Sequence, residues 1–143
     1  MPALMTDVFF YGLFMDTAVL EAKGVRSTQS RLAVVRGWAL RIGQRATLVP
    51  APDEAVHGVL MALPLADVER LYAEASVQMY RPVAVLVETA AGAVAGEATA
   101  VAGLAYVLPE PPAPAERNPE YATKLRALAQ RLGLPGEYCR SIR

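Results

Sequence analysis

The chain has 143 residues, of which 54% are hydrophobic, and its 14 basic and 14 acidic side chains give a formal net charge of zero. A chain of this length buries roughly two thirds of its unfolded surface, enough for one core but hardly for two, so we expect a single domain over residues 1–143. Zero net charge removes the basic surface that nucleic-acid binding normally needs. We therefore expect no nucleic-acid partner.

Targeting and redox signals favour a cytoplasmic protein. The N-terminal sequence MPALMTDVFF has no basic segment followed by an apolar core. No run of about 18 uncharged apolar residues is present, so we expect no membrane-spanning helix and no export. The single cysteine, Cys139, cannot form an internal disulfide, and with His57 as the one histidine there is no cluster for a zinc site. We expect no metal and no cofactor.

The first element is an apolar strand that turns into a helix within residues 7–16. Residues 8–11 form a strand-like run, Gly12 breaks it, and Asp16 is a good N-cap for a short helix over residues 16–23. A strand that turns sharply into a helix leaves successive backbone N–H groups unpaired, and such a loop can hold a carboxylate or a developing oxyanion. The loop is a candidate site, although an ordinary turn between a strand and a helix requires the same glycine.

The middle of the chain predicts antiparallel strands. Residues 31–42 alternate apolar and polar side chains, which predicts a long strand with one packed face. Arg36 interrupts that face; either the face reaches solvent there, which we favour, or Arg36 is a buried cation with a partner. Residues 46–49 and 56–63 predict two further strands, and the segment PAPDE at residues 50–54 predicts a turn between them.

The second half of the chain predicts a helix, a hairpin and a longer helix. A helical pattern over residues 65–73 precedes two strands, residues 81–88 and 97–108, and the small residues between these strands predict a hairpin. After a proline-rich connector, Asn118 is an N-cap for a helix over residues 119–132.

Glu74 is the carboxylate that the residues themselves single out. It stands where the helical pattern ends, beside Tyr72, Ala73 and Ala75, so it has little polar company in the sequence. Burial raises the pKa of a carboxyl group, and a general base works best with a pKa near the working pH, at about 6 to 7. An exposed glutamate at a helix end has the same sequence pattern, and from this segment alone we favour that interpretation.

Four short motifs occur in a fixed order along the chain. Tyr11-Gly12 ends the first strand, residues 71–75 (LYAEA) carry the glutamate, Tyr80-Arg81 precedes alternating valines, and the segment GLP at residues 133–135 precedes Tyr138. This order resembles the γ-glutamylcyclotransferase-like family, which includes AIG2-like proteins. The resemblance covers nearly the whole chain.

The resemblance implies both a fold and an activity. The implied fold is α+β, a small, closed or nearly closed mixed β-barrel with short flanking helices. The implied activity is cyclotransfer on a γ-glutamyl amine or γ-glutamyl amino acid, which releases 5-oxoproline with Glu74 as general acid/base and needs no cofactor. The γ-glutamyl compound is then the small-molecule partner. The residues expected to bind it are Tyr11, Gly12, Leu13, Phe14 and Tyr121.

The chain departs from the family pattern at three positions. Leu13 replaces a small polar residue, Tyr72 replaces an aspartate, and Ala75 replaces a glycine. Backbone donors survive a change of side chain, but a hydroxyl contact at position 13 is lost, and alanine shifts the backbone wherever the glycine has a positive φ. The alternative is therefore a catalytically inactive small-carboxylate-binding or interaction module on the same fold. The sequence names neither the leaving amine nor the oligomeric state.

Overall fold

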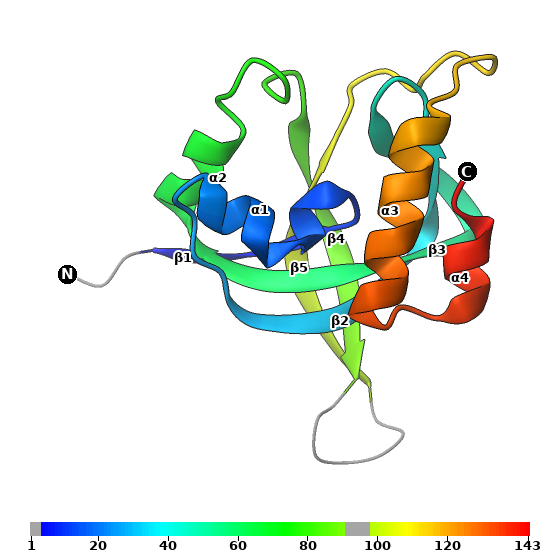
Figure 1. Ribbon diagram of the computed structural model, residues 1–143. Coiled ribbons are helices and arrows are strands. Elements are labelled where there is room, and N and C mark those ends of the chain that lie inside the picture. Colours follow the sequence, from blue (N-terminus) through cyan, green and yellow to red (C-terminus); the bar gives the residue numbers. More distant parts are fainter. Residues whose placement is uncertain (1–3, 91–97) are drawn as a thin grey trace.

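The computed structural model describes residues 4–90 and 98–143, and these form a closed barrel of five strands (Figure 1). The strands follow each other around the barrel in the order β1-β3-β2-β4-β5. They are β1 (Met5–Phe10), β2 (Thr28–Ile42), β3 (Ala46–Pro64), β4 (Arg81–Ala90) and β5 (Ala98–Val107). Neighbouring strands are antiparallel except β1 and β5, which close the barrel in parallel where Val8 lies opposite Leu104. The expected mixed barrel of an α+β protein is confirmed.

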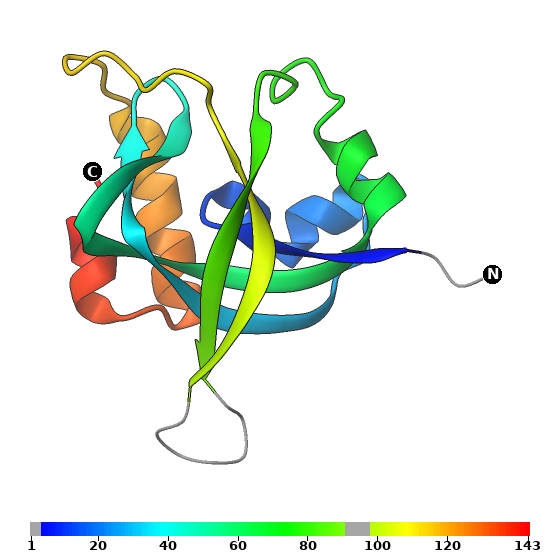
Figure 2. The same cartoon turned by 180° about the vertical axis from the view of Figure 1, so that it is seen from behind.

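Short helices pack outside this barrel. They are η1 (Leu13–Met15), α1 (Thr17–Ala22), α2 (Leu65–Leu71), α3 (Pro119–Leu132) and α4 (Gly136–Ser141). In both views α1 and α2 lie together toward one end of the barrel, and α3 and α4 toward the other (Figure 2). Among the described residues, no helix combines the length and the apolar character needed to cross a membrane.

The predicted helix signals act as expected. The Asp16 side chain accepts a hydrogen bond from the Ala18 amide and caps α1, and the Asn118 side chain does the same for the Tyr121 amide in α3. Gly133 ends α3 in the left-handed conformation, at φ 86°. These caps fix where α1 and α3 begin, and both helices border the loop that follows β1.

The apolar run of β1 is buried because the strand lies between β3 and β5 in the barrel. Val8, Phe9 and Phe10 are all nearly inaccessible to solvent. They belong to one continuous core with side chains from β3 and α3. The largest fully buried side chains of this core are Phe9, Met15, Leu20, Leu60, Met61, Leu63, Leu125 and Ile142.

The turn predicted at residues 50–54 is wrong, because β3 is one continuous strand through this segment. Strand β2 pairs with it on both sides of an irregularity, with Arg36 opposite Ala55 and Trp38 opposite Pro50. Gly37 alone faces the four intervening residues, and its φ of +87° is one that side chains other than glycine rarely adopt. The proline and acidic residues therefore form a bulge, which bends the strand pair without ending it.

The favoured interpretation of Arg36 is confirmed. Its side chain is 71% exposed, and its Nε lies 2.7 Å from a carboxylate oxygen of Glu88 on β4. Strands β4 and β5 pair antiparallel, as the predicted hairpin requires. Residues 91–97, which include most of the small-residue connection, lie outside the described residues.

Candidate functional site

The loop after β1 has the geometry that the sequence indicated. Gly12 is extended, at φ −117°, and the chain then makes a single turn of 3₁₀ helix. The Met15 amide donates to the Gly12 carbonyl at 3.0 Å, and the Asp16 amide donates to the Leu13 carbonyl at 3.1 Å. Within the described part of the chain, the amides of Gly12 and Phe14 donate to no other residue. These two N–H groups therefore have no acceptor among the described residues.

Gly12 packs closely against Tyr121. A Cβ atom at this position would lie 2.6 Å from the hydroxyl oxygen of Tyr121, which comes from α3. The backbone of Leu13 hydrogen-bonds the same hydroxyl and lowers the pKa of Tyr121, although burial outweighs this effect and the pKa is raised overall. The end of β1 and the start of α3 are thus joined at the phenol of Tyr121.

All the residues predicted to bind substrate line one cavity of about 560 Å³. This volume is typical of sites for small molecules. Tyr11, Gly12, Leu13 and Phe14 form one side, and Tyr121 reaches them from α3. The other lining residues are Phe10, Lys23, Gln44, Arg45, Ala46, Tyr72, Ser76, Val77, Tyr80 and Tyr106. We call this space the tyrosine cavity.

Five of the six tyrosines of the chain line this cavity. The rings of Tyr72 and Tyr106 are stacked, with centroids 3.8 Å apart and planes 8° from parallel. The Tyr11 hydroxyl donates to the Tyr106 carbonyl, and the Tyr80 hydroxyl donates to the Ala46 carbonyl. Sequence reasoning missed Tyr72 and Tyr106 as lining residues, because a tyrosine in an apolar strand or at a helix end has the pattern of an ordinary core residue.

Burial raises the pKa of Tyr11, Tyr72 and Tyr80. Neighbouring tyrosines raise each of these pKa values further, and the positive charge of Arg45 lowers that of Tyr80. The phenols therefore stay neutral near neutral pH. The cavity wall is polar without carrying negative charge.

The charged side chains at the cavity are basic. Lys23 and Arg45 are lining residues, and no carboxylate of the described residues lines the cavity with them. Glu74 lies beyond the lining residues and holds Lys23 through both carboxylate oxygens, at 2.7 and 2.9 Å from Nζ. Its side chain is 41% exposed. The sequence neighbours of Glu74 supply no such partner, and the one that it has, Lys23 at the end of α1, links it to the cavity.

The departures at Ala75 and Tyr72 have simple structural consequences. Among the described residues other than glycine, Gln29 is the one with a positive φ, so Ala75 causes no left-handed strain here. The Tyr72 ring lies between the rings of Phe14 and Tyr106. Its centroid is 5.8 Å from that of Phe14. This position adds apolar surface to the cavity wall.

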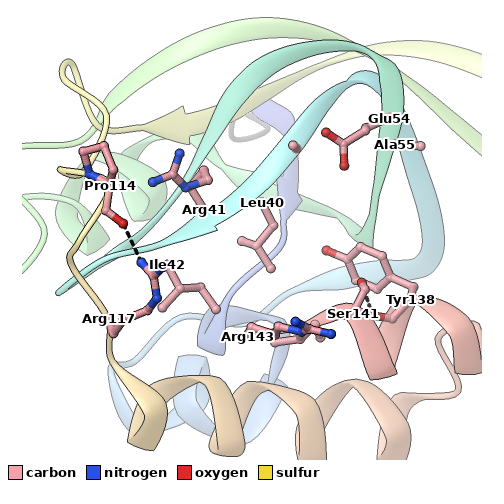
Figure 3. Close-up of a pocket in the computed structure, with 12 residues that line it drawn as sticks. Leu40, Arg41, Ile42, Glu54, Ala55, Pro114, Arg117, Tyr138, Ser141 and Arg143 are labelled. Carbon is pink, nitrogen blue, oxygen red and sulfur yellow. Dashed lines mark hydrogen bonds between the residues drawn. The ribbon is translucent and has the colours of Figure 1, made fainter.

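A second cavity of about 570 Å³ lies between the bent strands β2 and β3 and the C-terminal segment (Figure 3). Its lining includes Arg41, Arg117 and Arg143, with Glu54 as the acidic residue. None of the predicted site residues lines it. We call it the arginine cavity. In the described part of the chain, no three His, Cys, Asp or Glu side chains gather closely enough to hold a metal ion.

Comparison with known proteins identifies the family. The family described as gamma-glutamyl cyclotransferase, AIG2-like, matches residues 8–125. The structure of YkqA from Bacillus subtilis is 24% identical, with a TM-score of 0.75 over 95% of this chain and 52% of YkqA. A structure titled gamma-glutamyl cyclotransferase is 21% identical, with a TM-score of 0.74 over 98% of this chain and 89% of that one.

The uncharacterized human protein loc79017 is 22% identical, with a TM-score of 0.72 over 97% of this chain and 88% of that one. No curated protein matches the sequence. The chain spans about half the length of YkqA, and these likenesses establish the shared fold. With the family match extending from β1 into α3, the chain belongs to the gamma-glutamyl cyclotransferase, AIG2-like family.

Proposed function

We propose that this protein is a cyclotransferase that acts on a γ-glutamyl compound and releases 5-oxoproline. The observation that carries the proposal is the meeting of the loop from Tyr11 to Phe14 with Tyr121 in one cavity of about 560 Å³. Family membership supports the same class of reaction. The cavity has backbone donors, neutral phenols and positive charge, a combination suited to a small molecule that carries a carboxylate.

In the proposed reaction the nucleophile belongs to the substrate. The α-amine nitrogen attacks the γ-carbonyl carbon of the same glutamyl group, and a five-membered ring closes. The bond between that carbon and the leaving amine nitrogen then breaks. Two protons leave the attacking nitrogen, one before and one after the attack, and the leaving nitrogen takes up both, so the products are 5-oxoproline and the protonated amine. Holding the substrate in its folded conformer supplies much of the rate enhancement.

Glu74 is the proposed proton carrier. Its carboxylate already binds one ammonium group, that of Lys23, at 2.7 Å. The α-ammonium group of the substrate has the same charge and the same donors, so it can take a place beside or instead of Lys23. Glu74 then accepts its proton and returns it to the leaving nitrogen.

The loop after β1 is the proposed oxyanion site. Negative charge develops on the γ-carbonyl oxygen during the attack, and preorganised N–H groups stabilise such charge. The amides of Gly12 and Phe14 donate to no other described residue. Leu13 supplies only its backbone to this site, so the loss of a hydroxyl there leaves these donors in place.

A second candidate function is a binding module that recognises a small carboxylate and catalyses nothing. The position of Glu74 favours it, because its carboxylate is 41% exposed, is paired with Lys23 and lies outside the lining of the cavity. Leu13, which replaces the small polar residue of the family pattern, also favours the binding module.

An assay for 5-oxoproline distinguishes the two functions. The protein is incubated with γ-glutamyl dipeptides, γ-glutamyl amines and glutathione, and release of 5-oxoproline is followed. The proposal expects release from at least one of these compounds, at a rate proportional to protein concentration. Binding by calorimetry without any release would support the binding module and overturn the enzyme.

A further inference from the structure

The charges around the tyrosine cavity do not cancel. Lys23 and Glu74 neutralise each other in an ion pair of 2.7 Å. Arg45, the other basic lining residue, forms no ion pair with any described carboxylate. The Glu116 carboxylate, which contacts the turn of Arg45, accepts hydrogen bonds from the amides of Gln44 and Ala113. One positive charge is therefore left over at the cavity.

Arg45 is held in place at the cavity wall. Its Nε donates to the Ser76 carbonyl at 3.1 Å, which leaves the terminal guanidinium nitrogens available. Its charge lowers the pKa of Tyr80, so the guanidinium lies within electrostatic reach of the cavity interior. Ser76, Tyr80 and Arg45 are all lining residues.

The turn that carries Arg45 is also fixed. It joins β2 to β3, and the Asn118 side chain donates to the Gln44 carbonyl at 3.1 Å. A Cβ atom at Gly43 would lie 2.4 Å from Pro112, so the proline-rich connector packs tightly against the turn. The turn that places Arg45 at the cavity is thus held by a hydrogen bond and by close packing.

We propose that Arg45 binds a carboxylate on the leaving group and so determines which γ-glutamyl compounds this protein cyclises. The proposal rests on the function proposed above. A γ-glutamyl amine carries one positive and one negative charge, and both belong to the glutamyl part. A γ-glutamyl amino acid carries one further negative charge, on the leaving group. That charge matches Arg45, the lining cation that has no ion-pair partner among the described residues.

The glutamyl part has partners of its own. Its α-ammonium group is assigned to Glu74, and its carboxylate and developing oxyanion are assigned to the loop after β1. Arg45 lies on a different element, the turn between β2 and β3. It is therefore placed for the other end of the substrate, and guanidinium groups bind carboxylates in a two-pronged geometry.

A pair of compounds isolates this one interaction. γ-Glutamylalanine and γ-glutamylethylamide differ only by the carboxylate of the leaving group. The value of kcat/KM is measured for both with the wild type, Arg45→Gln and Arg45→Lys, and with Arg41→Gln as the control in the arginine cavity. Thermal unfolding confirms that each variant is folded.

The wild type should prefer γ-glutamylalanine by about 10- to 100-fold, the usual effect of a charge-assisted hydrogen bond. Arg45→Gln should reduce this ratio to about one, Arg45→Lys should keep part of it because the charge remains, and Arg41→Gln should keep all of it. Equal loss on both compounds in Arg45→Gln would place Arg45 on the glutamyl part and overturn the proposal. An unchanged ratio in that variant, or a wild type without preference, would overturn it as well.

Binding separates this proposal from the proposed function. If neither compound yields 5-oxoproline, the proposed function fails, and calorimetry with the same proteins decides the rest. If γ-glutamylalanine binds more tightly than γ-glutamylethylamide and this difference depends on Arg45, then Arg45 recognises the carboxylate although the protein is not an enzyme. Equal binding of both compounds, or binding of neither, would overturn it.

Discussion

The tyrosine cavity and the arginine cavity have nearly the same volume, about 560 and 570 Å³, but very different walls. The first is bounded by a loop with free amides, by Tyr121 and by four other tyrosines. The second is bounded by residues of β2, β3 and the C-terminal segment, with Arg41, Arg117 and Arg143 among them (Figure 3). Volume therefore does not identify the site.

The chemistry of the walls does distinguish the two cavities. Cyclotransfer needs oxyanion donors and a proton carrier around one substrate. The tyrosine cavity has Gly12 and Phe14 amides and is connected to Glu74 through Lys23. The arginine cavity has charge without an equivalent loop, and its Arg117 is engaged with the Pro114 carbonyl at 2.6 Å. If this contrast is correct, changes in the first cavity alter activity and changes in the second do not.

Among the residues that line either cavity, the largest effect is expected from Gly12→Val. The added side chain displaces the Tyr121 hydroxyl, which lies 2.6 Å from the Cβ position, and covers the loop amides. We expect kcat/KM for a γ-glutamyl compound to fall about 100-fold, as on loss of an oxyanion donor, with much of the fold retained. Steady-state kinetics and calorimetry check this. Unchanged affinity and turnover would remove the loop from the site.

A smaller effect is expected from Tyr121→Phe, which removes one neutral hydrogen bond and should lower kcat/KM by about 2- to 10-fold. The same change should rescue Gly12→Ala, because the next ring atom is 4.0 Å from the new Cβ, an ordinary contact distance. Urea unfolding of both single variants and the double variant measures this coupling. Additive free energies of unfolding would show that the close contact is absent.

The tyrosine cavity should also respond to alkali. The pKa of Tyr72 is raised, so the folded state holds this proton more tightly than the unfolded state, in which tyrosine titrates near 10. This stabilisation is complete below that pH and is lost as the pH rises above about 10. Tyr72→Phe should therefore flatten the loss of unfolding free energy by up to about 1.4 kcal/mol per pH unit. An identical pH dependence in the variant would contradict the burial of the phenol.

The smallest effect is expected in the arginine cavity. Arg41→Gln and Arg117→Gln should each leave kcat/KM for γ-glutamyl compounds within about twofold of the wild type, because neither residue lines the tyrosine cavity. The same assay measures both. A loss of kcat/KM comparable to that in Gly12→Val would mean that the arginine cavity also takes part in the reaction.

Much of the fold could be predicted because its signals are local. Asp16, Asn118 and Gly133 cap helices through contacts with their immediate neighbours, so their roles are visible in the sequence. The segment at residues 50–54 could not be assigned correctly in this way. Its composition is typical of a turn, and only the pairing of β2 on both sides, with Gly37 at the irregularity, keeps it within a strand.

The part of the candidate site that lies in sequence motifs could be predicted. The loop from Tyr11 to Phe14 follows from a strand that stops at a glycine, and Tyr121 entered through the family resemblance. The contact of Lys23 with Glu74 joins residues 51 positions apart, and no sequence periodicity links them. Arg45 was likewise not predicted, because its role depends on how the turn between β2 and β3 packs.

The central claim is that Glu74 carries the proton, and Glu74→Gln tests it most directly. Glutamine keeps the size of the side chain but cannot accept the proton, so turnover to 5-oxoproline should fall by about 10² to 10⁴ while binding changes far less. Glu21→Gln on α1 is the matched control, since Glu21 is an exposed glutamate outside the cavity lining, and it should retain wild-type turnover. Turnover by Glu74→Gln equal to that of the wild type would contradict the claim.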